Sequence, residues 1–245
     1  MGIPVERVLE KLDAYLNKKE YFAAERHLQY WLGEAELTGD RQGRLTILNE
    51  QIGFYRNLHR ESEAMAACSL ALEAADELAL DGTVGYATTL LNAATAYKAF
   101  GKAEQALPLY VRAEAIYEQR LSPRDRRRGG LYNNMALALV DLGRYCEAQS
   151  LFERAISVMA QVSGGEPDMA VTHCNLADLA DLEQDREKSL RHLDAAWALL
   201  HTAGLRQDGA YAFACEKCAP AFGRFGRPEQ EAALLKLAET ISRNL

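Results

Sequence analysis

One pattern occurs twice, 42 residues apart, in LLNAATAYKAFGKAEQALPLYVRAEAIY (Leu90–Tyr117) and YNNMALALVDLGRYCEAQSLFERAISVM (Tyr132–Met159). Alanines at one place in the pattern recur with that period at Ala64, Ala106 and Ala148. The register extends to Ala24 on one side and to Ser189 and Ala232 on the other. A fixed period of this length indicates one supersecondary unit stacked several times.

Each repeat divides into two helical stretches. Apolar residues at Leu90, Leu91, Ala94 and Tyr97 have the three-to-four-residue spacing of an amphipathic helix, and Gly101 then interrupts the pattern. Glycine suits the left-handed residue that closes a helix. The sequence therefore predicts an all-α solenoid of about six antiparallel helix pairs, in one array over residues 1–245. The approximate repeats are 4–38, 41–80, 84–121, 126–162, 167–203 and 207–245.

The two ends of the array are less regular than its middle. The first copy has Lys19 where later copies have glycine, and Trp31 where they have alanine. The sixth copy has Pro220 inside its first helix, where the missing N–H and the ring should kink or break the helix. Atypical terminal units are expected because one face of each has no neighbour.

Composition restricts the class of partner and the compartment. The net charge of −7 argues against nucleic acid, because phosphate binding needs a basic footprint. Five cysteines without a loop-rich framework favour reduced thiols and a cytoplasmic location. No signal peptide and no apolar run of membrane-spanning length is visible, so we expect no membrane association.

The motif made by Tyr97, Gly101, Ala106, Tyr110 and Ala113 resembles the tetratricopeptide repeat, with a longer period than the standard 34 residues. It is similar to the 42-residue variety found in kinesin light chains and bacterial homologues. The resemblance implies a right-handed superhelix of helix pairs. It also implies that the first helix of each pair lines a concave groove, which receives a peptide or helix of a partner protein. Neither a coiled-coil arm nor a helix-turn-helix segment accompanies the repeats in this sequence.

Asparagines at one repeat position are the best candidates for ligand binding. Asn92, Asn134 and Asn175 share this position, and Asn133 neighbours one of them. An asparagine inside a helix costs about 0.6 kcal/mol relative to alanine, which suggests a compensating use. An amide can pair with the backbone of an extended peptide, and the resemblance implies such a groove contact. Alternatively, each amide bonds to the neighbouring helix and fixes repeat stacking. The matching positions in the other copies are Glu10, Glu50 and Lys217.

Two further sets of polar residues accompany the asparagines. We expect four side chains on or near the same groove face: Thr88, Thr95, Asp141 and Asp178. A basic run at the start of a predicted helix is a candidate patch for an anion or an acidic partner: Arg124, Arg126, Arg127 and Arg128. A solvated helix surface and a solvated loop paired with nearby carboxylates are the respective alternatives.

No residues form a recognisable catalytic or metal-binding motif. Cys215 and Cys218 have the spacing of half a zinc site, but no second pair of ligands follows, and the spacing equally suits packing on one helix face. The histidines are scattered, and no phosphate loop or nucleophile elbow is present. We therefore expect neither an enzyme nor a metal or other cofactor.

The sequence favours a non-catalytic scaffold that binds a peptide or helix of another protein. One alternative is a sensor that changes curvature when it binds a small peptide. Another is a homo-oligomerisation module, since the predicted last helix over residues 229–244 carries Leu234, Leu235, Leu237 and Ile241 with no helix after it. Metal or redox chemistry at Cys215 and Cys218 is the enzymatic alternative.

Overall fold

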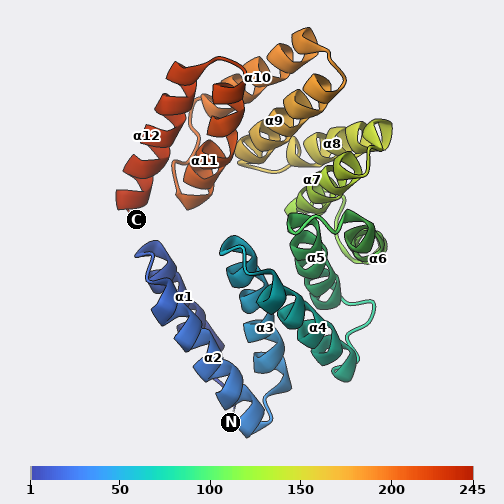
Figure 1. The fold of residues 1–245 in the computed structure, drawn as a ribbon, viewed down its shortest axis with the longest axis vertical. Helices are drawn as coiled ribbons and strands as arrows, with labels where there is room; N and C mark the ends of the chain where they lie inside the picture. The colour runs from blue at the N-terminus through green and yellow to red at the C-terminus, as the bar shows by residue number, and fades with distance from the viewer. Residues whose placement is uncertain (1, 245) are drawn as a thin grey trace. The chain divides into compact units, whose positions relative to one another are not determined.

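A computed structural model describes residues 2–244, and within that range the chain forms twelve α-helices and no strand (Figure 1). The chain divides into two compact units, residues 1–120 and residues 121–245. Unit 1 holds α1 (Val5–Asn17), α2 (Tyr21–Thr38), α3 (Arg41–Asn57), α4 (Glu61–Glu77), α5 (Val84–Ala99) and α6 (Ala103–Arg120). Unit 2 holds α7 (Arg126–Asp141), α8 (Tyr145–Met159), α9 (Glu166–Leu182), α10 (Arg186–Leu200), α11 (Gly209–Arg224) and α12 (Pro228–Asn244). The predicted all-α class is confirmed, whereas the single continuous array stays a prediction.

Each expected repeat range holds one pair of helices, and the helices of a pair pack against each other. The second helix of one pair also packs on the first helix of the next, as α2 does on α3 in unit 1 and α8 on α9 in unit 2. First helices contact each other too, in the pairs α3–α5, α7–α9 and α9–α11. The first helices of a unit therefore form one face, which we call the first-helix face of that unit.

One left-handed residue closes the first helix of every pair. Gly101 and Gly143 have φ of 72° and 71°, which confirms the predicted role of these glycines. Gly226 follows the same rule with φ of 79°. Three pairs use an ordinary residue instead: Lys19 at 58°, His59 at 55° and Gln184 at 62°. The expectation that every copy after the first has glycine here is therefore wrong for the second and fifth copies. A side chain with a Cβ is strained in this region, so these three turns carry a cost that glycine avoids.

The recurring small residue packs where the two helices of a pair cross. Ala106, Ala148 and Ser189 are fully buried, and each lies at the fifth residue after the left-handed residue of its turn. The prediction that Ala232 is the buried small residue of the sixth pair is wrong. Glu231 takes this position, and Ala232 is exposed. A Cβ on the facing Gly223 would lie 2.3 Å from Glu231 Oε2. Glycine on α11 therefore makes room for a long side chain where the other pairs use a small one.

The sequence predicts a kink or a break at Pro220, and the break is wrong. Helix α11 continues through Pro220 to Arg224. The missing N–H leaves the carbonyl of Glu216 without its helical donor, but both residues are exposed. Water satisfies a carbonyl on an exposed helix face, so the helix continues. Helix α6 likewise contains Pro108 in its interior.

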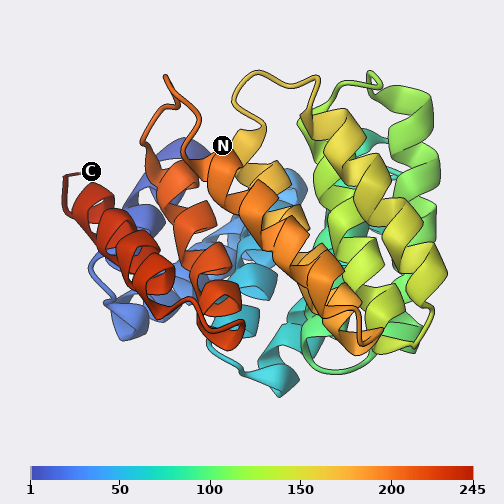
Figure 2. The same cartoon turned by 90° about the horizontal axis from the view of Figure 1, so that it is seen from above.

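The last helix is packed into unit 2. Helix α12 lies beside α11 (Figure 2), and Leu234 and Ile241 are buried in a shared core, with Leu237 partly buried against it. Leu235 is 46% exposed. The apolar residues that suggested a homodimer are therefore mostly used within the chain, and Leu235 alone of the four offers a large exposed surface. Along the described chain, no helix combines the length and apolarity needed to span a bilayer.

Candidate functional site

The predicted asparagines of unit 2 form a hydrogen-bonded cluster on its first-helix face. Asn175 Nδ2 on α9 donates to Asn133 Oδ1 on α7 at 2.9 Å. The same oxygen accepts from Thr172 Oγ1 at 3.2 Å. Asn133 Nδ2 donates to Asn134 Oδ1 at 3.4 Å. Two first helices are thus joined by amides that hold one another in a fixed orientation.

Unit 1 contains the same amide-to-amide bond, although its threonine accepts rather than donates. We call this bond the asparagine clamp, Asn133–Asn175 in unit 2 and Asn49–Asn92 in unit 1. Asn92 Nδ2 on α5 donates to Asn49 Oδ1 on α3 at 2.9 Å. Asn49 Nδ2 donates to Thr89 Oγ1 at 3.1 Å and to the Leu45 carbonyl at 3.0 Å. Asn49 precedes Asn133 by two repeats, so each clamp is built from the same register positions.

The clamps show that the amides bond between neighbouring helices, as the stacking alternative expected. Asn92, Asn134 and Asn175 are nevertheless only half-buried. The Oδ1 atoms of Asn92 and Asn175 accept no hydrogen bond from the described residues, and neither is buried without a partner. Neither oxygen is therefore fully buried, and a fixed acceptor without a donor among the described residues remains in each clamp. Asn92 belongs to unit 1, whereas Asn134 and Asn175 belong to unit 2.

Asn49, Thr89 and Thr172 were missed because the sequence reading followed one repeat position. A signal was available, since Asn49 and Asn133 occupy the position next to that one, two repeats apart. The threonines carry no such sign, because threonine inside a helix usually bonds to its own backbone. Thr89 and Thr172 do so as well, to the carbonyls of Gly85 and Asp168.

The other expected groove residues have different surroundings. Thr95 Oγ1 accepts from Tyr110 of α6 at 3.2 Å, and Thr88 Oγ1 lies 3.0 Å from Tyr117 Oη of α6, so both threonines bond inside their own helix pair. Asp178 accepts from Arg224 Nη2 of α11 at 2.6 and 2.7 Å. Asp141 is exposed at the end of α7.

The sixth copy adds an apolar and a cationic group to the first-helix face of unit 2. Phe213 on α11 is 58% exposed, which is unusual for a phenylalanine in a folded domain. Lys217, at the register position of Asn175, places its Nζ 5.2 Å from the centre of that ring. This contact leaves the lysine head and one ring surface available to a ligand.

Most of the basic run is engaged within unit 2. Arg126 pairs with Asp168 at 2.5 Å and donates to the Gly164 carbonyl at 2.8 Å. Arg127 pairs with Asp125, the N-cap of α7, at 2.7 Å. Arg128 Nη2 donates to the hydroxyl of Tyr132 at 3.1 Å. Arg124 is exposed. An anion at this patch would therefore compete with carboxylates already present.

Unit 2 also contains a histidine pair that the sequence did not suggest. His173 Nδ1 on α9 lies 3.0 Å from His192 Nδ1 on α10. Burial, together with the charge of His192, lowers the pKa of His173 to about 4. Burial lowers the pKa of His192 as well. The pair is therefore neutral near pH 7, with one ring donating to the other. The sequence contains only a weak signal for this contact, since the two histidines lie at similar distances on either side of one turn.

The cysteine pair is a packing element. Cys215 and Cys218 lie in the buried core of unit 2. Burial raises the pKa of Cys215 to about 11, and a hydrogen bond with Cys174 together with burial raises the pKa of Cys218. Metal binding and nucleophilic attack both need the thiolate, which these surroundings disfavour. Within residues 2–244, no three histidine, cysteine or acidic side chains gather as a metal site.

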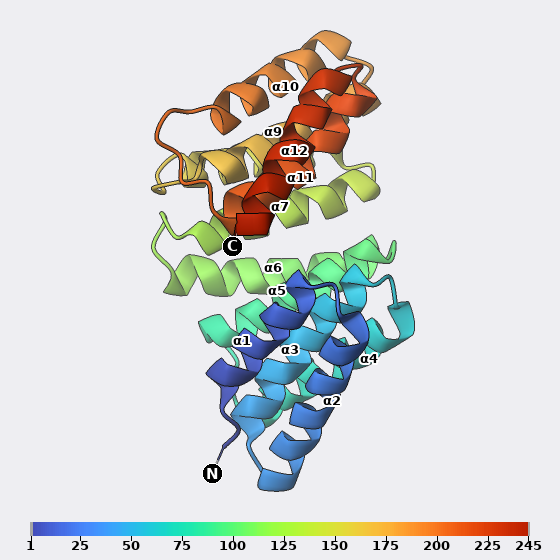
Figure 3. The same cartoon turned by 90° about the vertical axis from the view of Figure 1, so that its left-hand side faces the viewer.

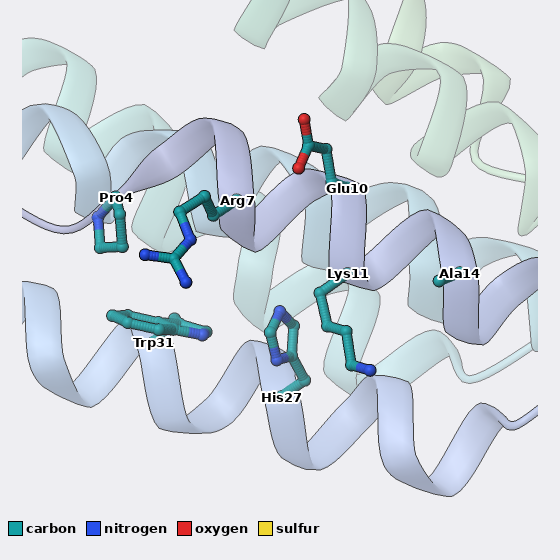
Figure 4. Close-up of a pocket in the computed structure, with 7 residues that line it drawn as sticks. All are labelled: Pro4, Arg7, Glu10, Lys11, Ala14, His27 and Trp31. Atoms are coloured by element: carbon teal, nitrogen blue, oxygen red, sulfur yellow. The ribbon is translucent and has the colours of Figure 1, made fainter.

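Unit 1 has a cavity of about 490 Å³ between α1 and α2 (Figure 4). Arg7 and Lys11, one turn apart on α1, extend toward Trp31 and His27 of α2, whereas the carboxylate of Glu10 points away. His27 Nε2 donates to the Val8 carbonyl at 2.9 Å, which fixes the ring. The atypical Trp31 of the first copy thus forms one wall of an open cleft in the first pair.

Comparison with known proteins agrees with this architecture. Residues 128–200, which run from α7 to α10, match a family model described as tetratricopeptide repeat. A search of the curated proteins finds no sequence that matches the chain.

Several solved structures share the fold. BtubC (BKLC) from P. vanneervenii is 22% identical over 80% of this chain and 79% of its own, with a TM-score of 0.70. A putative kinesin light chain with nearly identical TPR-like repeats, from Podosopora anserina, is 18% identical over 82% and 96%, with a TM-score of 0.58. NprR in complex with its cognate peptide NprX is 14% identical over 98% of this chain and 67% of its own, with a TM-score of 0.63.

The chain therefore has the fold of a tetratricopeptide-repeat array of the long-period, kinesin-light-chain-like variety, as the sequence predicted. At these identities the likeness establishes the fold.

Proposed function

We propose that this protein is a non-catalytic interaction scaffold that binds a peptide or helix of a partner protein on its first-helix faces. The observation that carries the proposal is the asparagine clamp. Asn133 fixes Asn175, and Asn49 fixes Asn92, so that each clamped amide keeps an unused oxygen that is not fully buried. An oriented acceptor of this kind suits the N–H groups of an extended ligand backbone.

A fixed amide binds more favourably than a mobile one. Immobilising a free side chain costs about 0.5–1.5 kcal/mol on binding. The clamps already hold the amides of Asn92 and Asn175 in the folded protein, so ligand binding does not have to immobilise them. The same hydrogen bonds therefore serve stacking and prepare recognition. The exposed Phe213 would add an apolar contact on the same face of unit 2. The fold shared with the NprR–NprX complex makes a peptide a reasonable ligand class.

Selection from a random twelve-residue peptide library on phage tests the proposal. Asn134→Ala is the most informative variant, because Asn134 makes only one long hydrogen bond, at 3.4 Å. Asn17→Ala, at the exposed end of α1, is the matched control. We expect selected peptides to bind wild type and the control alike, and to bind Asn134→Ala and Asn175→Ala at least fivefold more weakly.

Thermal melting separates ligand contact from stacking. Asn175→Ala should lower the melting temperature, since it breaks the clamp, whereas Asn134→Ala should leave it almost unchanged. Failure to select any peptide on the folded wild type, or unchanged affinity in both variants, refutes the proposal.

The fold shared with NprR, which was solved in complex with its cognate peptide, also favours a second candidate, a sensor whose curvature changes when it binds a peptide. Small-angle X-ray scattering with and without a selected peptide distinguishes the two functions. An unchanged scattering curve excludes the sensor and keeps the scaffold. For a homo-oligomer, Leu235→Glu is the test, and a monomeric mass for wild type by light scattering removes that alternative.

A further inference from the structure

The first helices of unit 1 enclose a second cavity, of about 330 Å³, that the asparagine clamp does not explain. Leu12 and Leu16 of α1 and Phe54 of α3 give it apolar walls, and Tyr21, Asn57 and Leu58 also line it. Helix α1 packs mainly on α2, whereas α3 packs closely on α5. Helices α1 and α3 lie side by side (Figure 3), and they leave this space between them.

One charged group lines this cavity, the carboxylate of Glu50 on α3. Glu50 is half-buried, and no hydrogen bond or ion pair joins it to another described residue. Burial raises the pKa of Glu50, and the negative charge of Asp13 on α1 raises it further. A partly buried carboxylate without a cation has lost part of its hydration, and a cation bound beside it would offset that loss.

The repeat register gives the second observation. Glu50 occupies the position that Asn92, Asn134 and Asn175 occupy in the third to fifth copies. The third to fifth copies therefore present a neutral amide at this position, and the second copy presents a negative charge inside an apolar pocket. One turn later, Gly53 also lines the cavity, and a Cβ on it would have no atom within 4 Å. The pocket is thus open beside the carboxylate.

We propose that this pocket, the Glu50 pocket, binds a lysine or arginine side chain of the partner peptide. The long aliphatic stem would lie along Leu12, Leu16 and Phe54, and the cationic head would reach Glu50. A stem and head of this kind match a largely apolar cavity whose lining includes one carboxylate. The inference rests on the proposed function and specifies the charge of the segment that lies over unit 1.

Charge complementarity favours this occupant over an apolar or acidic one. An apolar side chain would bury Glu50 more deeply without compensation, and an acidic one would add repulsion to that from Asp13. A cation replaces the lost hydration of the carboxylate with a charge-assisted hydrogen bond.

Double-mutant analysis of selected peptides tests the inference. Peptides selected on wild type are synthesised with their lysine and with norleucine, which keeps the stem but removes the charge. Affinities are measured by fluorescence anisotropy on wild type, Glu50→Gln and Glu10→Gln. Glu10→Gln changes the net charge equally at an exposed site of the same repeat register that does not line the pocket.

We expect wild type and Glu10→Gln to bind the lysine peptide about tenfold more tightly than the norleucine peptide. Glu50→Gln should bind both peptides equally, and it should melt no lower than wild type, because it removes an uncompensated charge. Gly53→Leu should fill the pocket and weaken binding of both peptides. This variant keeps the test valid should Glu50→Gln fold poorly.

The outcomes separate the two proposals. Selected peptides whose charge discrimination survives in Glu50→Gln, or whose binding is unaffected by Gly53→Leu, overturn the Glu50 pocket and leave the asparagine scaffold standing. If no peptide is selected on wild type, both proposals fall.

Discussion

One glycine in a turn and one inside a helix allow the effect of the same substitution, glycine to alanine, on stability to be predicted with opposite signs. Gly143 closes α7 with φ of 71°, whereas Gly33 lies inside α2 with an ordinary helical backbone. A Cβ built on either glycine has no atom within 4 Å. Neither substitution creates a clash, so the backbone conformation alone decides the result.

The magnitudes follow from two opposing effects. Alanine in place of glycine restricts the unfolded chain, which stabilises the fold by about 0.5–1 kcal/mol where the backbone is helical. A Cβ in the left-handed region costs about 1–2 kcal/mol. Gly33→Ala should therefore gain about 0.5–1 kcal/mol, and Gly143→Ala should lose about 0.5–1 kcal/mol.

Thermal melting followed by circular dichroism measures both changes. At about 3 °C per kcal/mol for a chain of this size, the two variants should differ by on the order of 5 °C, with wild type between them. Gln184→Gly should raise the melting temperature, because Gln184 adopts φ of 62° in the equivalent turn. Shifts of the same sign for Gly33→Ala and Gly143→Ala would refute the reasoning.

Three more predictions concern unit 2. His173, with a folded pKa of about 4 against about 6.5 when unfolded, resists protonation only in the folded state. Stability should therefore fall as pH drops below 6.5, by about 2 kcal/mol between pH 7 and pH 5. Urea titration at both pH values measures this loss, and His173→Gln should remove most of it. Gly165→Ala would put a Cβ 2.2 Å from the backbone oxygen of Met159, so it should lower the free energy of unfolding by about 3 kcal/mol. Gly130→Ala has open space around the new Cβ and should be neutral or stabilising. Urea titration measures both changes. Asn133→Ala removes the acceptor for two groups on α9 and should cost about 1–2 kcal/mol, and the same titration would contradict this if it showed no change.

The repeat period predicted the helices well because it is a local property of the chain. Spacing of small and apolar residues fixes which face of each helix is buried, and Gly101 and Gly143 mark where first helices end. The predictions for Ala232 and Pro220 failed because the surroundings of each residue allow an exception to the repeat pattern. Glu231 takes a small-residue position because Gly223 faces it, and Pro220 is tolerated because its turn of α11 is exposed.

The candidate site was only partly predictable, for a different reason. Asn92, Asn134 and Asn175 stand out as polar residues at one repeat position, so the sequence located them. Asn92 bonds to Asn49 and Asn175 bonds to Asn133, each in the preceding helix pair, and the register alone does not show which side chains reach each other across two helices. His173 and His192 illustrate the same limit, since their contact depends on how α9 and α10 face each other.

The sequence by itself determined the number of helices, their pairing and the register of the buried small residues in the first five pairs, because these follow from a period along the chain. Only the tertiary structure decided that two clamps fix the asparagine amides, and that Glu50, at the same register position, lines an apolar cavity without a cation. Repetition sets equivalent positions on successive helices, but the distance between those helices sets what each position contacts. Where α3 packs closely on α5 an amide is bonded across the interface, and where a cavity lies between α1 and α3 a carboxylate borders open space.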